Sequence, residues 1–120
     1  MMVLADTSVW VDHWRHGNQE LAALLEEDRV VMHPMILGEL ALGALRSRDE
    51  VLGDLQELRS GTMAEHEEVL ELVERRKLWG HGIGWVDAHL LASALLDGTR
   101  LWTLDRHLSR VAGGLGLTAP

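Results

Sequence analysis

The chain has 120 residues, 47% of them hydrophobic, which is enough for one domain with a single core. It has no cysteine, which excludes disulfides and thiolate metal sites, and no apolar stretch that approaches the ~20 residues needed to span a bilayer. Its net charge of −8, from 11 basic and 19 acidic residues, argues against a broad cationic surface for nucleic acid and would suit a basic partner.

Short apolar runs alternate with helical patterns through the first half of the chain. Residues 1–5 are apolar enough for a buried strand that ends at Asp6, and residues 29–32 form a second strand before Pro34. Helical segments are predicted around residues 9–14, from Asn18 to Leu25, from Pro34 to about Arg46, and from about Asp49 to Leu58.

The second half continues this alternation. An amphipathic helix is predicted over residues 64–78, and the glycines at 80, 82 and 84 then form a flexible connector. The following elements are a helix from Trp85 to Leu96 with Gly98 to stop it, a strand at 101–104, a short helix, and a strand-like segment at 115–118. The pattern predicts a single α/β domain over residues 1–120, with three layers and about four or five short parallel strands flanked by helices.

Glu39 stands alone among apolar residues. From Pro34 to Leu45 the sequence PMILGELALGAL contains no other charged or strongly polar side chain. Burial of an unpaired carboxylate is costly unless a cation, hydrogen bonds or water compensate it. We therefore predict that Glu39 lies on a buried helix and has a function; the alternative is a narrow solvent-facing stripe on that helix.

Asp6 and Asp105 each follow a predicted strand and precede a helix. In a parallel sheet the carboxyl ends of the strands open on one edge, where ligands usually bind. Both carboxylates are therefore predicted to face one crevice. Each position also suits an N-cap that accepts hydrogen bonds from backbone amides, and this simpler role stays open for both residues.

Asp87 lies in the first turn of the apolar helix, where the helix dipole favours an acid whatever its function. The side of the helix on which Asp87 lies says more about its role than its place in the first turn does. Residues 90, 91, 94 and 95 are Leu, Leu, Ala and Leu, and Asp87 shares their side of the helix. Asp87 is therefore predicted to face inward, as Glu39 is.

Four carboxylates in one crevice would repel one another and raise their own pKa values unless a cation kept them ionised. Oxygen ligands from Asp and Glu select Mg²⁺ or Mn²⁺ over zinc. Such an ion activates water to attack a phosphodiester, and it reverses the local field that an acidic protein presents to a phosphate. We therefore predict a metal-dependent nuclease site built from Asp6, Glu39, Asp87 and Asp105.

Four sequence segments surround these acids: VLADTSVWVD, ILGELALGALR, GIGWVDAHLLASALL and LWTLDRHL. Together they resemble the motifs of PIN-domain ribonucleases, in particular the VapC toxins of bacterial and archaeal toxin–antitoxin pairs, and the resemblance covers the whole chain. It implies a PIN-like fold in which the four acids bind one or two Mg²⁺ or Mn²⁺ ions. It also implies that the hydroxyl of Ser8 supports the site.

The same resemblance implies an activity and partners. These are cleavage of RNA to 5′-phosphate and 3′-hydroxyl ends, a homodimer, and inhibition by a cognate VapB-type antitoxin whose tail occupies the active site. Some family members carry a further acid two residues after the last aspartate, where this chain has His107. The best candidates for binding RNA phosphates are Arg75, Arg76, Lys77 and Arg106. The lack of cysteine and of a membrane-spanning stretch favours the cytoplasm.

Other interpretations stay open at this point. The chain could be a catalytically inactive PIN-like module that binds a basic partner. A phosphatase of the haloacid dehalogenase kind would need a second aspartate where Ser8 stands, and a phosphoreceiver domain would need a lysine after a late strand, whereas Lys77 is the only lysine. Trp10 and Trp14, at helical spacing, belong either to the core or to a groove for a second copy or an antitoxin.

Overall fold

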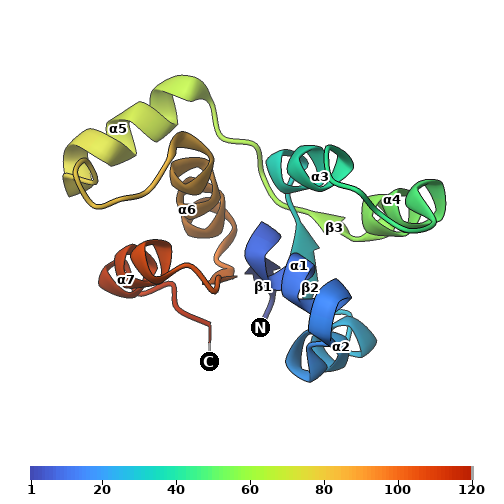
Figure 1. The fold of residues 1–120 in the computed structure, drawn as a ribbon. Coiled ribbons are helices and arrows are strands. Elements are labelled where there is room, and N and C mark those ends of the chain that lie inside the picture. Colours follow the sequence, from blue (N-terminus) through green and yellow to red (C-terminus); the bar gives the residue numbers. More distant parts are fainter. Residues whose placement is uncertain (120) are drawn as a thin grey trace.

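A short parallel sheet lies at the centre of the structure, a computed structural model that describes residues 1–119 (Figure 1). Its strands are β1 (Val3–Ala5), β2 (Val30–Met32), β3 (Arg59–Ser60) and β4 (Arg100–Trp102), in the order β3-β2-β1-β4. Every pairing is parallel, and Val3 of β1 pairs with Val30 on one side and Arg100 on the other. β1 is therefore a central strand, and all three of its residues are buried.

The strand order creates a switch point beside β1. The chain passes from β1 outward through β2 to β3 and then returns to β4 on the opposite side of β1. Ligand crevices form at such reversals, outside the carboxyl ends of the two strands that flank them. The residues that follow β1 and β4, beginning with Asp6 and Thr103, are therefore brought to one edge of the sheet.

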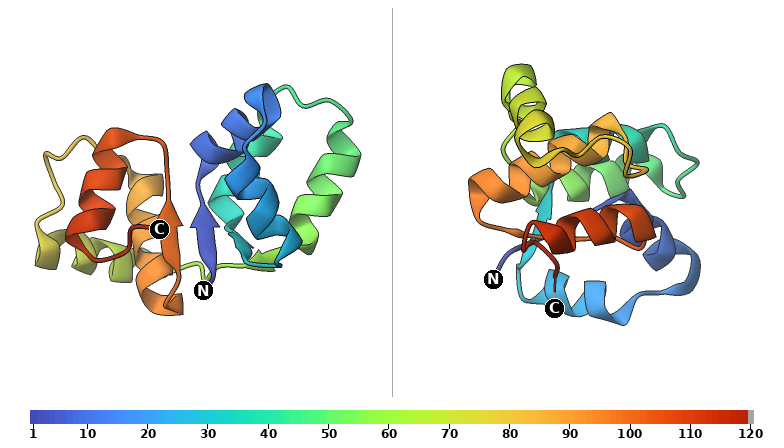
Figure 2. Two further views of the ribbon diagram at one scale, coloured as in Figure 1. Left: turned by 90° about the horizontal axis from the view of Figure 1, so that it is seen from below. Right: turned by 90° about the vertical axis from the view of Figure 1, so that its left-hand side faces the viewer.

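Seven helices occur in the described residues: α1 (Thr7–His16), α2 (Gln19–Glu26), α3 (Pro34–Ala41), α4 (Arg48–Glu57), α5 (His66–Arg76), α6 (Trp85–Asp97) and α7 (Arg106–Gly114). Seen from below, α1 to α4 gather on one side of β1 and β4, and α5 to α7 on the other (Figure 2, left). The core between them contains large buried side chains from both groups, such as Val9, Ile36, Leu90 and Leu108. Every residue from Ala88 to Ala94 of α6 is buried, so this helix runs through the interior.

The local sequence explains where the helices begin and end. Four helices begin after a side chain that accepts a hydrogen bond from a backbone amide of the first turn: Asp6, Asn18, His33 and Asp105. Pro34 occupies the first position of α3, where its missing N–H is not needed. Gly98 ends α6 with a φ of 68°, a conformation that glycine adopts without strain.

The predicted α/β class and parallel sheet are confirmed, and three details differ. The sequence does not predict β3, because its two residues, Arg59 and Ser60, are exposed and polar. α3 ends at Ala41 instead of near Arg46. The segment at 115–118 adds one isolated bridge, between Leu101 and Thr118.

Among residues 1–119, no helix combines the length and the apolar character that crossing a membrane requires.

Candidate active site

Asp6 follows β1 at the switch point, and only 7% of its surface is exposed. Its Oδ1 accepts hydrogen bonds from the backbone amide and the hydroxyl of Ser8, at 3.0 and 2.5 Å. Its Oδ2 accepts a hydrogen bond from Thr103 Oγ1 at 2.6 Å. Asp6 is therefore an N-cap of α1, as the simpler alternative predicted, and also a buried carboxylate tied to the segment after β4.

Two hydroxyl groups connect Asp6 to the chain that follows β4. The Ser8 hydroxyl accepts a hydrogen bond from the amide of Leu104 at 2.9 Å, and Thr103 Oγ1 accepts one from the amide of Asp105 at 3.0 Å. The Ser8 hydroxyl thus contacts a candidate carboxylate, and its supporting role stays a prediction. Sequence reasoning missed Thr103, although a threonine at the end of a strand, two residues before a candidate acid, is a usable signal.

Asp87 and Asp105 belong to two different helices. Asp105 is the N-cap of α7: it accepts a hydrogen bond from the amide of Leu108 at 2.9 Å, and about half of its side chain is exposed. Asp87, in the first turn of α6, is half-buried and accepts a hydrogen bond from the amide of Gly84 at 3.0 Å. His107 lies next to Asp105, with Nδ1 at 3.8 Å from Oδ1. Both aspartates therefore stabilise helix starts in addition to any role in a site.

Burial raises the pKa of two of the carboxylates, Asp6 and Asp87. Burial raises the pKa of Asp6, although its hydrogen bonds with Ser8 and Thr103 oppose this shift. Burial also raises the pKa of Asp87, and the negative charges of Asp105 and Glu39 raise it further. The charges of Asp105 and Glu39 therefore act on Asp87, and a bound cation would favour its ionised form.

Glu39 is exposed, so the prediction that it lies on a buried helix is wrong. α3 buries only Ile36 and Leu40, and Leu42, just beyond its end, is 91% exposed. Apolar neighbours in the sequence thus do not mark a buried helix face here, because too little of the fold covers α3. The burial argument for a cation does not apply to Glu39.

Glu39 nevertheless has two connections to the other acids. Thr7 Oγ1 donates a hydrogen bond to Glu39 Oε1 at 2.6 Å, and Thr7 directly follows Asp6. The second connection is electrostatic, since the charge of Glu39 raises the pKa of Asp87. The side chain of Glu39 is therefore held beside the switch point although water reaches it.

The chemistry of these side chains suits a hard divalent cation, because carboxylates and hydroxyls provide only oxygen ligands. Within residues 1–119, however, no three Asp, Glu or His side chains are close enough together to hold a metal ion. The carboxylates are engaged as helix caps and as acceptors from hydroxyl groups. The donor set therefore fits such an ion in type and charge, and the side chains would have to draw together to coordinate it.

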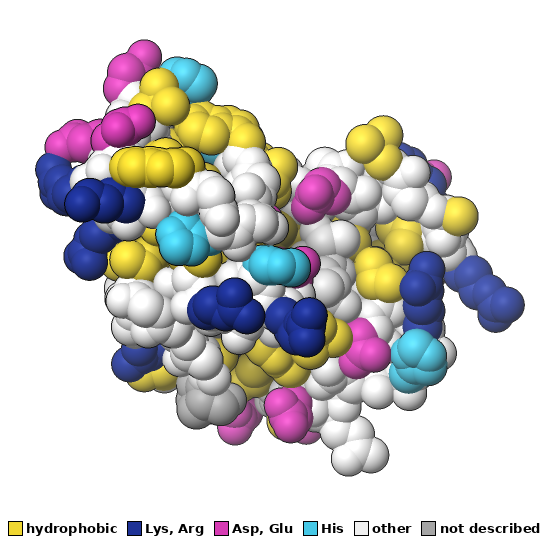
Figure 3. All heavy atoms as spheres, turned by 60° about the vertical axis from the view of Figure 1, so that its left-hand side comes forward, with side chains coloured by type: hydrophobic (Ala, Val, Ile, Leu, Met, Phe, Trp, Pro, Cys, Tyr) yellow, Lys and Arg dark blue, Asp and Glu magenta, His cyan; other side chains and the backbone are white. Residues whose placement is uncertain are grey.

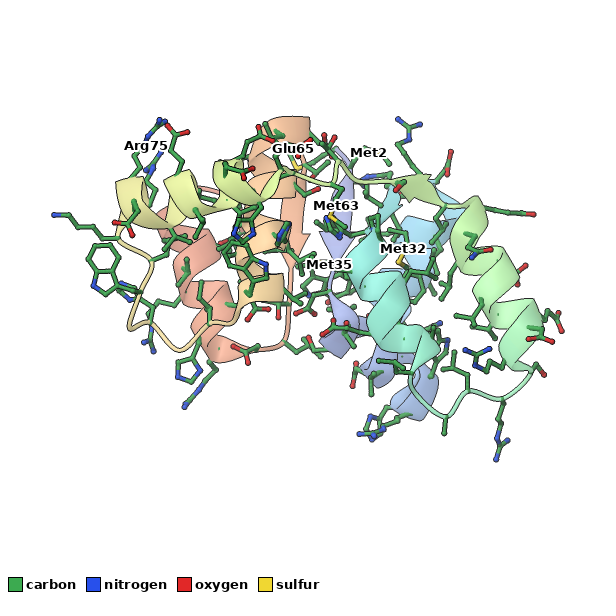
Figure 4. The ribbon with its side chains drawn as sticks, turned by 90° about the horizontal axis from the view of Figure 1, so that it is seen from above. Met2, Met32, Met35, Met63, Glu65 and Arg75 are labelled. Carbon is green, nitrogen blue, oxygen red and sulfur yellow. The ribbon has the colours of Figure 1, made fainter. Side chains whose placement is uncertain are left out.

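The four basic residues predicted to bind RNA lie in two parts of the structure. Arg106 is exposed and directly follows Asp105 at the start of α7. Arg75, Arg76 and Lys77 lie at the end of α5, which Figure 4 shows to be the end away from α3, and Arg75 forms an ion pair with Glu71. Figure 3 shows Lys, Arg and His side chains beside a hollow with acidic side chains. Arg106 is therefore better placed beside the candidate site than the group on α5.

A groove of about 460 Å³ begins at Thr7 and Glu39 and is bordered by α1, α3, α4 and the connection between α3 and α4. Its apolar lining includes Val11, Trp14, Leu40, Leu45 and Val51. Trp14 belongs to this groove, whereas Trp10 is 3% exposed and belongs to the core. Trp10 is therefore a core residue, whereas for Trp14 a groove for a second copy or an antitoxin stays a prediction.

The match to a family model identifies the class of protein to which this arrangement belongs. The model of the PIN domain matches residues 3–114, so the chain belongs to the PIN-domain family. Within that family it is similar to Ribonuclease VapC32 of Mycobacterium tuberculosis, from strains CDC 1551 / Oshkosh and ATCC 25618 / H37Rv. Each relative is 47% identical over 117 residues, which cover 97% of this chain and 94% of the relative. The predicted resemblance to VapC-type PIN ribonucleases is thereby confirmed.

Proposed function

We propose that this chain is an endoribonuclease that depends on Mg²⁺ or Mn²⁺ and acts as the toxin of a toxin–antitoxin pair. One observation carries the proposal: Asp6 is a buried carboxylate at the switch point, and the Thr103 hydroxyl that donates to it also accepts a hydrogen bond from the amide of Asp105, so two of the candidate acids lie at the same edge of the sheet. The PIN family and relatives named as ribonucleases support RNA cleavage as the reaction.

Asp6, Glu39, Asp87 and Asp105 would hold the ion, which when bound supplies an activated water and stabilises the charge on the leaving oxygen. Ser8 and Thr103 fix both oxygens of Asp6. Thr7 orients Glu39 through its hydroxyl. Arg106, exposed beside Asp105, binds an RNA phosphate and so positions the strand, and Arg75, Arg76 and Lys77 contact the RNA farther away.

We propose partners of two kinds, in the cytoplasm. A second copy of the chain forms a homodimer, as expected for this family. A VapB-type antitoxin covers the active site, and the groove that begins at Glu39 and contains Trp14 gives it an apolar path to the carboxylates. The names of the relatives support this partner.

The decisive experiment uses purified protein freed of any partner and a structured RNA. We expect cleavage with Mg²⁺ or Mn²⁺, 5′-phosphate ends on the products, and no cleavage with a chelator. Asp6→Asn and Asp87→Asn should each lower the rate by roughly a hundredfold or more, since each removes a charge needed at the site. Asp54→Asn, which changes an exposed aspartate of α4, is the matched control and should cut normally. Activity that survives both site substitutions would contradict the assignment.

One observation favours a second candidate, a catalytically inactive PIN-like module that binds a basic partner. Within the described residues the acids do not form a closed metal site, and the net charge of −8 suits such a partner. Calorimetric titration with Mn²⁺ separates the two candidates. The nuclease requires saturable binding that Asp6→Asn weakens, whereas the inactive module requires no such binding.

A further inference from the structure

His107 lies in the first turn of α7, two residues after Asp105, and the proposed function gives it no role. Its Nδ1 is 3.8 Å from Asp105 Oδ1, and about half of its side chain is exposed. An imidazole beside a candidate acid can act on the site in two ways, as a ligand of the ion or by packing. The surroundings of the ring favour packing.

The ring of His107 packs against the backbone of Gly82. A Cβ atom at position 82 would lie 2.7 Å from Cδ2, 3.0 Å from Cγ and 3.3 Å from Nε2 of the imidazole. Carbon atoms in contact prefer about 3.5–4.0 Å, so glycine alone fits here without a shift of the ring. Because Cγ is the ring atom nearest the main chain, rotation about the Cβ–Cγ bond does not clear the space. A side chain at position 82 would therefore displace the whole imidazole.

This contact joins the start of α7 to the connection between α5 and α6, residues 77–84. Figure 1 shows that connection returning from the far end of α5 to the start of α6. Gly84, at its end, donates its amide to Asp87 Oδ2 at 3.0 Å. On the other side, His107 follows Asp105, the N-cap of α7. Both carboxylates are thus held by backbone that lies within a few residues of the contact.

The separation of the two carboxylates matters for a shared ion. Asp87 and Asp105 are near enough for the charge of Asp105 to raise the pKa of Asp87. Side chains that bind one ion must keep their positions to within about 0.5 Å, which requires neighbours that are themselves fixed by packing. Ile83 is half-buried against the core and restrains the connection beside Gly82. A rigid ring between this restrained connection and α7 provides such a neighbour.

We propose that His107 is a positioning residue, whose ring packs on Gly82 and sets the separation of Asp87 and Asp105. This inference rests on the proposed metal-dependent function and adds a residue outside the four carboxylates. His107 acts through its shape and not as a ligand of the ion. Because His107 and Gly82 are both exposed and bury little apolar area, the contact affects the affinity for the metal ion more than the stability of the fold.

Calorimetric titration with Mn²⁺ compares two glycines of the same connection. Gly82 and Gly80 have φ values of +79° and +77°, so alanine strains the backbone equally at both. A Cβ at Gly80, however, would meet no atom of residues 1–119 within 4 Å. Gly82→Ala should weaken Mn²⁺ binding by roughly tenfold to a hundredfold, the range for residues that orient metal ligands. Gly80→Ala is the matched control and should bind as the unchanged protein does. Equal effects of the two substitutions would overturn the proposal.

Substitutions of His107 separate the ring from its nitrogen atoms. His107→Ala removes the ring and should weaken Mn²⁺ binding as Gly82→Ala does, whereas His107→Phe keeps a ring and should retain most of the affinity. A double variant with Gly82→Ala and His107→Ala should bind no more weakly than either single variant, because the added methyl group enters the space that the ring has left. If His107→Phe is as weak as His107→Ala, a nitrogen of the imidazole binds the ion and the positioning role is wrong.

A measurement without metal distinguishes this inference from the proposed function. In two-dimensional NMR spectra of the metal-free protein, His107→Ala should shift the amide signals of Gly84 and Asp87, which are far from it in the chain. Unshifted signals of both residues would overturn the positioning role. If the unchanged protein does not bind Mn²⁺, the metal-dependent function fails, and the NMR comparison alone decides whether His107 positions Asp87.

Discussion

Thr103 uses one hydroxyl group for two contacts, since it donates to Asp6 Oδ2 and accepts from the amide of Asp105. Thr103→Val keeps the shape of the side chain and removes both contacts. The pKa of Asp6 then rises further, and the folded protein is less stable wherever that carboxylate is ionised. We expect a loss of about 1–3 kcal/mol at neutral pH, measured by urea unfolding.

Thr103→Ser is the control for this substitution, because it retains the hydroxyl and loses only a methyl group. It should be clearly more stable than Thr103→Val at neutral pH. The difference should shrink at a pH low enough to protonate Asp6, since the hydroxyl then no longer faces a charge. Equal stability of the two variants at neutral pH would show that this hydrogen bond contributes little.

Asp87 should make the metal-free protein less stable as the pH rises. Its folded-state pKa lies above the ordinary value of 3.8, so the folded chain holds the proton more tightly than the unfolded chain. The resulting contribution to stability is fully present below pH 3.8 and is lost as the pH rises through the raised pKa. Asparagine at this position cannot ionise, so the Asp87→Asn variant should not show this loss. Its urea midpoint should therefore exceed that of the unchanged protein by more at neutral pH than at acid pH. An unchanged pH profile would contradict the assigned shift.

Some helices and strands are easy to predict from the sequence, because the pattern that indicates them lies within the element itself. Gly98 and the continuous apolar residues of α6 indicate that helix and its end, and β1 and β2 are short apolar runs. β3 has no such pattern, and its pairing with β2 depends on residues far away in the chain, as in the pair Val31 and Arg59. Strand pairing of this kind follows from the tertiary structure and not from local propensity.

The same distinction applies to the candidate site. Asp6, Asp87 and Asp105 lie directly after β1, in the first turn of α6 and after β4, and a single sequence is enough to predict these positions. The exposure of Glu39 could not be predicted in this way, because burial depends on which elements cover α3. The hydrogen bond between Thr7 and Glu39 likewise requires knowledge of how α1 and α3 pack.

Two glycine positions should respond to substitution in opposite directions. Gly98 has a φ of 68°, and alanine there is strained, so Gly98→Ala should destabilise the protein by roughly 1 kcal/mol. Gly53 lies inside α4, where an added Cβ meets no atom within 4 Å. Gly53→Ala should stabilise the protein by about 0.5–1 kcal/mol. Urea unfolding measures both, and a loss of stability at Gly53 would contradict the account of α4.

Metal binding should be visible in the stability of the molecule as a whole. A cation that binds the folded chain alone adds about 2.7 kcal/mol when its concentration is a hundred times its Kd. For a domain of this size the Tm should rise by several degrees with Mn²⁺. Asp6→Asn and Glu39→Gln should reduce this rise, and Asp54→Asn should keep it. A Tm that does not respond to Mn²⁺ would support the inactive module.

The hydrogen bond between Thr103 and Asp6 joins residues that are 97 positions apart. On the ribosome β1 is synthesised first, and β4, one of its two neighbours in the sheet, is synthesised near the end. Until then one edge of β1 is unpaired and Asp6 lacks its second hydroxyl donor. A nascent chain therefore cannot complete the hydrogen bonds of Asp6 or the pairing of β1 until residues near its end have been synthesised.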